Sequence, residues 1–253
     1  MTVEIHAMTC GWLTMSLKAM LAGAEGKLKI PIPSYLIRHP KGNVLFDTGL
    51  NKQVQTDPEA RLGKIAKYYA VDFEAGQDVV ARLESLGLEP KDITFLVNSH
   101  LHFDHAGGND ALDCCPVVLQ RREWEAANDP DVAAKVGYMK QDFDHGHDRI
   151  LADGEHDLFG DGAVVCIPTP GHTPGHQSLK VRHASGDIVL TGDACYLRRT
   201  LEEMRLPMIL SDADQMMDSL KKLKALQDRG ARIFYGHDPE FWATVPQAPA
   251  AVV

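Results

Sequence analysis

The segment between residues 100 and 105 gathers three imidazoles and one carboxylate into six positions. It reads HLHFDH and is followed directly by AGG. Imidazole nitrogens and carboxylate oxygens are the atoms that zinc and related divalent ions accept as ligands in proteins. The alternative, a set of solvent-exposed or hydrogen-bonded histidines, does not account for the ligand-type residues that follow downstream. The segment therefore predicts a metal site.

Three further residues of ligand type lie downstream, each beside a glycine. They are His172 in TPGH, Asp193 in TGD and His237 in YGHD. Apolar stretches typical of strands end just before the four ligand-bearing segments, over 93–98, 163–168, 187–190 and 232–234. Because sites in α/β sheets form at the carboxyl ends of strands, we expect these side chains to meet at one edge. The glycines permit the tight turns that aim the ligands.

These seven candidates are too many for one tetrahedral ion, and they suit two ions that share a carboxylate. Sequence spacing assigns His100, His102 and His172 to the first ion and Asp104, His105 and His237 to the second, with Asp193 as the bridge. Two ions about 3.5–4 Å apart can hold a hydroxide between them and clamp substrate oxygens. Such a centre supplies a nucleophile near neutral pH without any serine or cysteine. The sequence thus predicts a dinuclear hydrolytic site.

Short strands interleaved with helices must position these ligands. Further strands are predicted over 30–37, 43–47, 116–119 and 177–182. Apolar residues at helical spacing predict helices around 79–86 and 216–223, the second with a capping box formed by Ser211 and Asp214. The segments 51–74 and 142–156 are interpreted as loops or short helices. The pattern indicates one α/β domain over residues 1–253 with a mixed sheet.

Composition limits the function classes. The formal net charge of −9 argues against a nucleic-acid partner, because phosphate binding requires clustered lysine and arginine. Five cysteines form no CxxC pair and, being odd in number, fit no disulfide framework, which favours a reducing cytoplasm. The N-terminal region resembles neither a signal peptide nor a membrane span. We therefore expect a cytoplasmic monomer or homodimer that binds no membrane and no nucleic acid.

Taken together, the segment 100–108, His172, Asp193 and His237 resemble the metal motifs of the metallo-β-lactamase superfamily in order and spacing. The sequence LFDTG at 45–49 is similar to the early aspartate motif of that superfamily. The resemblance covers nearly the whole chain. It implies an αβ/βα four-layer sandwich, in which two mixed sheets are flanked by helices and a dinuclear metal site lies at one sheet edge.

A narrower resemblance is to the N-acyl-homoserine lactonases of this superfamily, and it is carried by the segments 99–109, 171–179 and 193–196. It implies a quorum-quenching hydrolase in which a metal-bridging hydroxide opens the lactone ring. It also implies that Tyr196 contacts the lactone carbonyl and that Phe103 lines the substrate pocket. Asp104 is the expected proton donor to the leaving alkoxide. The sequence departs from the family at Cys195, where a small hydroxyl residue is common.

Several roles are expected around this centre. Zn²⁺ is the expected metal at both positions, and Fe, Co or Mn suit the same ligands. Asp47 is expected to orient a ligand histidine through a hydrogen bond. His176 is interpreted as a structural, hydrogen-bonding histidine, and the HxH pair at 145–147 as a surface turn. The acyl groove is assigned to four residues, namely Met15, Met20, Tyr68 and Tyr69.

Other functions remain open at this point. The same metal machinery can serve a lactonase for another ring, such as 4-pyridoxolactone, or a promiscuous esterase or phosphotriesterase. The ligands also accept iron, so a non-hydrolytic iron protein is a separate class. A protein that only stores metal is a further possibility. Product analysis against a panel of lactones separates the hydrolases, and metal analysis with a visible absorption spectrum identifies an iron protein.

Overall fold

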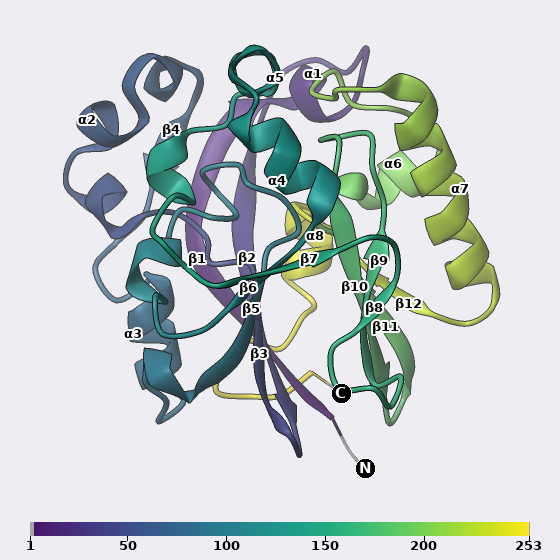
Figure 1. Ribbon diagram of the computed structural model, residues 1–253. Helices are drawn as coiled ribbons and strands as arrows, with labels where there is room; N and C mark the ends of the chain where they lie inside the picture. The colour runs from purple at the N-terminus through teal and green to yellow at the C-terminus, as the bar shows by residue number, and fades with distance from the viewer. Residues whose placement is uncertain (1–2, 253) are drawn as a thin grey trace.

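The computed structural model describes residues 3–252, whose strands form two sheets that face each other (Figure 1). The larger sheet is built from β1 (Glu4–Ser16), β2 (Lys27–His39), β3 (Gly42–Phe46), β4 (Ala70–Asp72), β5 (Ile93–Val97), β6 (Val117–Gln120) and β7 (Arg149–Ala152). The smaller sheet is built from β8 (His156–Asp157), β9 (Val164–Pro168), β10 (Gln177–His183), β11 (Gly186–Leu190) and β12 (Arg232–Phe234).

Both sheets are mixed. The strand order is β4-β1-β2-β3-β5-β6-β7 in the larger sheet and β12-β11-β10-β9-β8 in the smaller. In the larger sheet β1, β2 and β3 pair antiparallel, and β3, β5, β6 and β7 run parallel. In the smaller sheet β10 is antiparallel to β9 and β11, whereas β11 and β12 are parallel. The strands β9, β11 and β12 therefore point the same way.

In the part of the chain that the structure describes, eight α-helices surround the sheets, and the longer ones cover the two outer faces. The eight are α1 (Leu17–Met20), α2 (Pro58–Leu62), α3 (Val79–Glu84), α4 (Arg121–Asn128), α5 (Pro130–Val136), α6 (Arg198–Glu202), α7 (Ala213–Asp228) and α8 (Pro239–Trp242). Buried residues of α3 and α4 pack on the larger sheet, and those of α6 and α7 pack on the smaller sheet. Within residues 3–252, no helix has the length and apolar character needed to traverse a bilayer.

The main core lies between the two sheets. Buried side chains such as Phe46 and Val97 of the larger sheet meet Val164, Leu179 and Leu190 of the smaller one. Alternation along each strand explains this arrangement, because every second side chain of a strand points to the same face. The layers therefore run helix, sheet, sheet, helix, and the predicted pair of mixed sheets flanked by helices is confirmed.

The predicted strands are all present, with boundaries shifted by a few residues. The strand β1 was not predicted, and β7 lies in the segment 142–156, which was interpreted as loop or short helix. The capping box assigned to Ser211 and Asp214 is wrong. The cap of α7 is Asp212, whose side chain accepts from the backbone N–H of Gln215 at 2.9 Å, whereas Ser211 donates to the carbonyl of Gly171.

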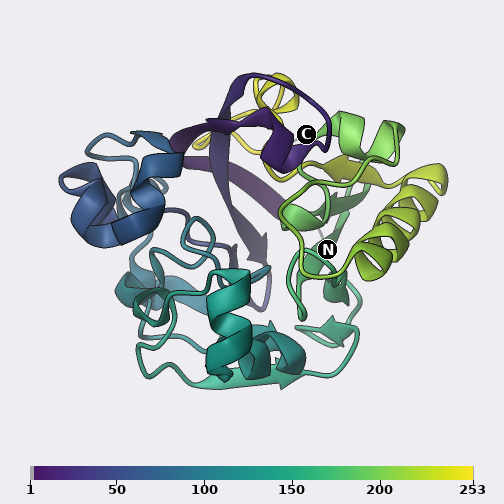
Figure 2. The same cartoon turned by 90° about the horizontal axis from the view of Figure 1, so that it is seen from above.

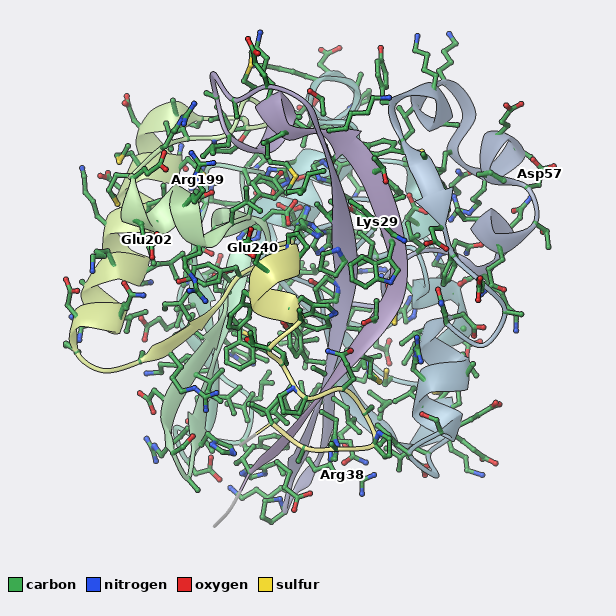
Figure 3. The ribbon with its side chains drawn as sticks, turned by 180° about the vertical axis from the view of Figure 1, so that it is seen from behind. Lys29, Arg38, Asp57, Arg199, Glu202 and Glu240 are labelled. Atoms are coloured by element: carbon green, nitrogen blue, oxygen red, sulfur yellow. The ribbon has the colours of Figure 1, made fainter. Side chains whose placement is uncertain are left out.

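One end of the sandwich is surrounded by short helices. Figure 1 shows α1, α2 and α5 gathered at this end, and Figure 2 looks down on it from above. Seen from behind, Asp57 marks the outer end of α2, on the side of the molecule opposite Arg199 and Glu202 of α6 (Figure 3). A buried ion pair between Arg61 of α2 and Asp142 ties this projecting segment to the body of the protein.

Candidate metal centre

The candidate ligands converge at this end of the sandwich, in the loops that follow β5, β9, β11 and β12. Because β5 belongs to the larger sheet and the other three strands to the smaller, the ligands come from both halves of the fold. The structure groups them into two clusters, His100, His102, His172 and Asp193 in one and Asp104, His105 and His237 in the other. Every one of these side chains is buried or half-buried.

In the first cluster, three imidazole nitrogens form a nearly equilateral triangle. Nδ1 of His102 lies 3.0 Å from Nε2 of His100 and 3.0 Å from Nε2 of His172, and the two Nε2 atoms are 3.2 Å apart. Ligand nitrogens about 2.0–2.1 Å from a tetrahedral zinc lie ~3.3 Å from one another. Burial lowers the pKa of all three rings, which favours the neutral form that binds metal.

In the second cluster, buried nitrogens lack hydrogen-bond partners. Nε2 of His105 and Nε2 of His237 are both buried and make no hydrogen bond. Oδ2 of Asp104 lies 3.9 Å from the first and 3.8 Å from the second. Buried polar groups in folded proteins are nearly always paired, so unpaired atoms that face one point indicate a missing partner. A divalent cation satisfies all three side chains.

The carboxylate of Asp193 lies between the clusters. Its Oδ1 is 3.2 Å from Nε2 of His105 and 3.0 Å from Nε2 of His237. Its Oδ2 is 3.3 Å from Nε2 of His172 and 3.7 Å from Nε2 of His100. One oxygen therefore faces each cluster, which is the geometry that a bridging carboxylate requires. Burial would raise the pKa of Asp193, but the neighbouring histidines hold it well below its usual range.

Asp47 holds the ring of His105 from the side opposite Asp193. Its Oδ2 lies 2.8 Å from Nδ1 of His105, and its Oδ1 accepts from the backbone N–H of Ser99 at 2.7 Å. Asp47 has a positive φ of 59°, a left-handed conformation that aspartate tolerates better than most residues. The contact leaves Nε2 of His105 to face the cluster, as the orienting partner of a metal ligand does.

His176 supports the backbone of Asp193. Burial lowers the pKa of His176 to about 3, so the ring is neutral. Its Nε2 accepts from the backbone N–H of Asp193 at 3.0 Å, and its Nδ1 donates to Oγ1 of Thr169 at 2.9 Å. Thr169 is linked to Ser178, which donates to the carbonyl of Thr191. The expected structural role of this histidine agrees with these contacts.

A pocket of about 200 Å³ opens over the two clusters. Besides the ligands it is lined by Met15, Ile30, Ile65, Tyr69, Phe103, Val136, Gly137, Tyr196 and Ile209. The hydroxyl of Tyr196 lies 3.1 Å from Nδ1 of His172. Burial and the carboxylates of Asp193 and Asp104 hold the pKa of Tyr196 well above its usual range. The phenol therefore stays protonated and can donate a hydrogen bond at neutral pH.

Two of the residues assigned to the acyl groove do not line this pocket. The side chain of Met20 is fully buried and packs with Leu13 and Leu21 in the core beneath the pocket. Tyr68 ends a turn of 3-10 helix with 65% of its surface exposed, and the ammonium of Lys67 lies over its ring. The structure thus places neither Met20 nor Tyr68 at the wall of this pocket.

The HxH pair at 145–147 is also less exposed than expected. His147 is buried, and its ring lies 6.0 Å from that of His145. Among residues 3–252, no third side chain of ligand type joins these two in a metal-binding group. The pair therefore does not form a further metal site in this structure.

Sequence reasoning did not identify Glu123 and Ser99. Oγ of Ser99 lies 2.8 Å from Oδ2 of Asp47 and 2.9 Å from Nδ1 of His100. Glu123 is completely buried in the first turn of α4. One indication was present in the sequence for Glu123, because it closely follows the predicted strand at 116–119, whose carboxyl end lies at the same edge as the metal ligands.

Comparison with known proteins agrees with this geometry. The model of the Metallo-beta-lactamase superfamily matches residues 29–237. The N-acyl homoserine lactonase AttM of Azorhizobium caulinodans is 37% identical over 237 residues, which cover 91% of this chain and 90% of that protein. The N-acyl homoserine lactonase AiiA of Bacillus thuringiensis subsp. kurstaki is 33% identical over 216 residues, covering 84% of this chain and 83% of the relative.

Solved structures show the same fold. A 1.4 Å structure of an N-acyl homoserine lactone hydrolase, with the product N-hexanoyl-L-homoserine bound at its catalytic metal centre, superposes with a TM-score of 0.89 at 30% identity and covers 100% of both chains. The fold, the two ligand clusters and the extent of the family match lead to one conclusion: the chain belongs to the metallo-β-lactamase superfamily.

Proposed function

We propose that this protein is a metal-dependent hydrolase that opens the ring of N-acyl-homoserine lactones. The observation that carries the proposal is the position of Asp193, whose two oxygens face the two ligand clusters at the floor of a pocket that also contains the Tyr196 hydroxyl. The names of the relatives support the same activity, since lactonases match most of the chain.

Two divalent ions fit the donor atoms, and zinc suits the histidine-rich set. His100, His102 and His172 would hold one ion, Asp104, His105 and His237 the other, with Asp193 shared between them. When bound, such ions supply Lewis acidity and lower the pKa of a water molecule. Nδ1 of His172 and of His105 face hydrogen-bond acceptors, the carbonyl of Ile209 and the carboxylate of Asp47, which leaves both Nε2 atoms for metal.

The other polar side chains of the pocket have separate tasks. Tyr196 is positioned to donate its phenolic proton to the lactone carbonyl oxygen as negative charge develops there. Asp104 is half-buried at the pocket wall, and its carboxyl oxygen can hold a proton and pass it to the ring oxygen as the ester bond breaks. The two groups thus serve the two oxygens of the scissile ester.

The apolar wall of the pocket fits the acyl chain. Met15, Ile30 and Ile65 contribute flexible or branched side chains, and the rings of Tyr69 and Phe103 lie 5.2 Å apart beside them. Burying a hydrocarbon chain against such a surface contributes about 0.8 kcal/mol per methylene. Longer acyl chains are therefore expected to bind more tightly until the wall ends.

The experiment is a proton-release assay with short-chain and long-chain acyl-homoserine lactones, run beside elemental analysis of the purified protein. Release of one proton per lactone, with about two metal ions per chain, supports the proposal. The panel includes 4-pyridoxolactone, simple esters and a phosphotriester. If one of these is hydrolysed far faster than every acyl-homoserine lactone, the proposed substrate is wrong. A visible absorption spectrum without lactone turnover identifies a non-hydrolytic iron protein.

Four further points belong to the proposal. We propose that zinc is the resident metal and that residues 1–253 act as one domain. We also propose a cytoplasmic location, because the five cysteines are all free thiols and four of them are buried. We propose that the protein is a monomer or a homodimer, and light scattering of the purified protein tests this oligomeric state.

A further inference from the structure

Glu123 is a completely buried carboxylate whose four hydrogen-bond donors are all uncharged. Oε1 accepts from the backbone N–H of Leu101 at 3.0 Å and from the hydroxyl of Tyr138 at 2.7 Å. Oε2 accepts from Oγ1 of Thr173 at 2.8 Å and from the backbone N–H of Gly175 at 3.0 Å. A buried carboxylate costs free energy unless its oxygens are well hydrogen-bonded, so this arrangement calls for an explanation.

Three of the four donors come from the segments that carry the first ligand cluster. Leu101 stands between His100 and His102, and Thr173 directly follows His172. These two loops are about seventy residues apart in the sequence and follow strands of different sheets. The carboxylate of Glu123 therefore joins, through its two oxygens, the backbones that present the three imidazoles.

The fourth donor, Tyr138, links Glu123 to the ring of His102. Tyr138 places its ring 5.5 Å from that of His102, and Nε2 of His102 donates to the carbonyl of Val136 at 3.0 Å. That hydrogen bond turns Nδ1 of His102 toward the first cluster. Because Glu123 holds Tyr138, it also holds the segment that sets the orientation of this ring.

The loop after His172 packs so closely on α4 that neither can shift toward the other. A Cβ atom at Gly175 would lie only 2.0 Å from the backbone nitrogen of Glu123, so the loop after His172 packs directly on the first turn of α4. The second cluster has a different support, since Asp47 hydrogen-bonds His105. Glu123 hydrogen-bonds no ligand of the second cluster, whereas Asp47 holds His105 directly and reaches His100 through Ser99.

We propose that Glu123 is a positioning residue that sets the spacing of His100, His102 and His172 and thereby the affinity of the first metal position alone. This inference rests on the proposed pair of metal ions. Removing the orienting partner of a metal ligand typically costs 10–100-fold in metal affinity. The effect should be confined to one of the two ions, because Asp47 and the second cluster are untouched.

The Glu123→Gln variant tests this with almost no change in volume. A glutamine has one oxygen and one NH2 group, whereas the site presents a backbone N–H on each side. Either orientation of the amide therefore points its NH2 group at the N–H of Leu101 or at that of Gly175. The two loops can no longer both be held. Tyr138→Phe, which deletes one of the four donors, is a milder second variant that preserves the carboxylate.

The measurement is stepwise metal affinity by competition with a chelator, with Co²⁺ substitution to follow the ligand geometry in the visible spectrum. For Glu123→Gln we expect one of the two ions to bind about 10–100-fold more weakly, the other to bind as in the wild type, and a changed Co²⁺ band for the weakened position. Tyr138→Phe should weaken the same ion by a smaller factor.

The control is Asp78→Asn, which alters another buried carboxylate that accepts from a backbone N–H, that of Ala81 in α3. It should lower the unfolding temperature without changing the ratio of the two ion affinities. If Glu123→Gln behaves the same way, or weakens both ions equally, Glu123 is structural and the inference is overturned. Two bound ions without lactone turnover contradict the proposed substrate only, because the affinity ratio is measured without substrate.

Discussion

Oδ1 of Asp193 lies 3.0 Å from Nε2 of His237, and neither atom has a hydrogen-bond partner. A buried polar atom that makes no hydrogen bond costs about 1–3 kcal/mol, and the ion-pair contact between these two atoms recovers only part of that cost. A cation bound to both removes that cost. The pair therefore indicates that Asp193 and His237 share a metal ion, and it explains why the second oxygen of Asp193 is directed to the other cluster.

Asp193→Asn should cost the protein metal as well as activity. An asparagine offers one oxygen and one NH2 group, so one of the two clusters faces a donor in place of an acceptor. We expect at least one ion fewer per chain by elemental analysis and at least a 10–100-fold lower lactone turnover. Asp187→Asn, near the start of the strand β11 that precedes Asp193, is the matched control. Full metal content with full rate would refute the bridging role.

Tyr196→Phe should slow turnover while leaving the metals in place. The substitution removes only the hydroxyl, which the structure places beside His172 at the pocket floor. Loss of one preorganised donor to a developing oxyanion is expected to reduce kcat by roughly 10–1,000-fold. The comparison is Tyr68→Phe, which removes an exposed hydroxyl outside the pocket. An unchanged kcat for Tyr196→Phe removes this residue from the mechanism.

Exhaustive chelation should abolish lactone hydrolysis, and added Zn²⁺ or Co²⁺ should restore it. The expectation follows from the ligand clusters, since no serine or cysteine nucleophile lines the pocket among residues 3–252. The rate is followed by proton release before chelation, after chelation and after metal is returned. Undiminished turnover in protein shown to be free of metal is the contrary result.

In the metal-stripped protein, His176 should contribute less to stability as the pH is lowered. His176 has a pKa of about 3 in the folded protein and about 6.5 when unfolded, so between these values only the unfolded chain binds a proton at this ring. Its contribution to the free energy of unfolding is complete above pH 6.5. That contribution declines below pH 6.5 by up to about 1.4 kcal/mol per pH unit.

Urea unfolding at several pH values between 5 and 7 measures this slope. His176→Gln has no titrating ring, so its free energy of unfolding should depend less steeply on pH than that of the wild type. Burial also lowers the pKa of His100 and of His172, so the variant should keep part of the slope. Identical slopes would show that His176 is not protected from protonation by the fold.

The elements that carry the ligands were predictable because their pattern is local. The strands β5, β9 and β11 are short apolar runs closed by glycine, proline or asparagine, and each ends directly before a ligand. The strand β1 was missed for a physical reason. It mixes polar and apolar residues, is interrupted by a register shift between Thr9 and Trp12, and takes its order from pairing with β2.

The supporting contacts were less accessible to sequence reasoning. Asp47 sits in a recognisable motif, whereas the four donors to Glu123 are spread over residues 101–175 and two of them are backbone N–H groups. Nearly every residue has a backbone N–H, so the residue type does not reveal which of these groups will donate to a buried carboxylate. The positions of Met20 and Tyr68 away from the pocket were equally hard to foresee, because the direction of a side chain on a short turn depends on the neighbours it meets after folding.

The ligands reach the centre from both sheets of the sandwich, and this has a consequence for how the protein comes apart. His100 follows a strand of one half, whereas Asp193 and His237 follow strands of the other. Bound ions would therefore link the two halves across the interface between the sheets. The halves could separate only after the ions had dissociated. The unfolding temperature should then rise with the logarithm of the free metal concentration. Chelation should separate the two halves before either of them unfolds.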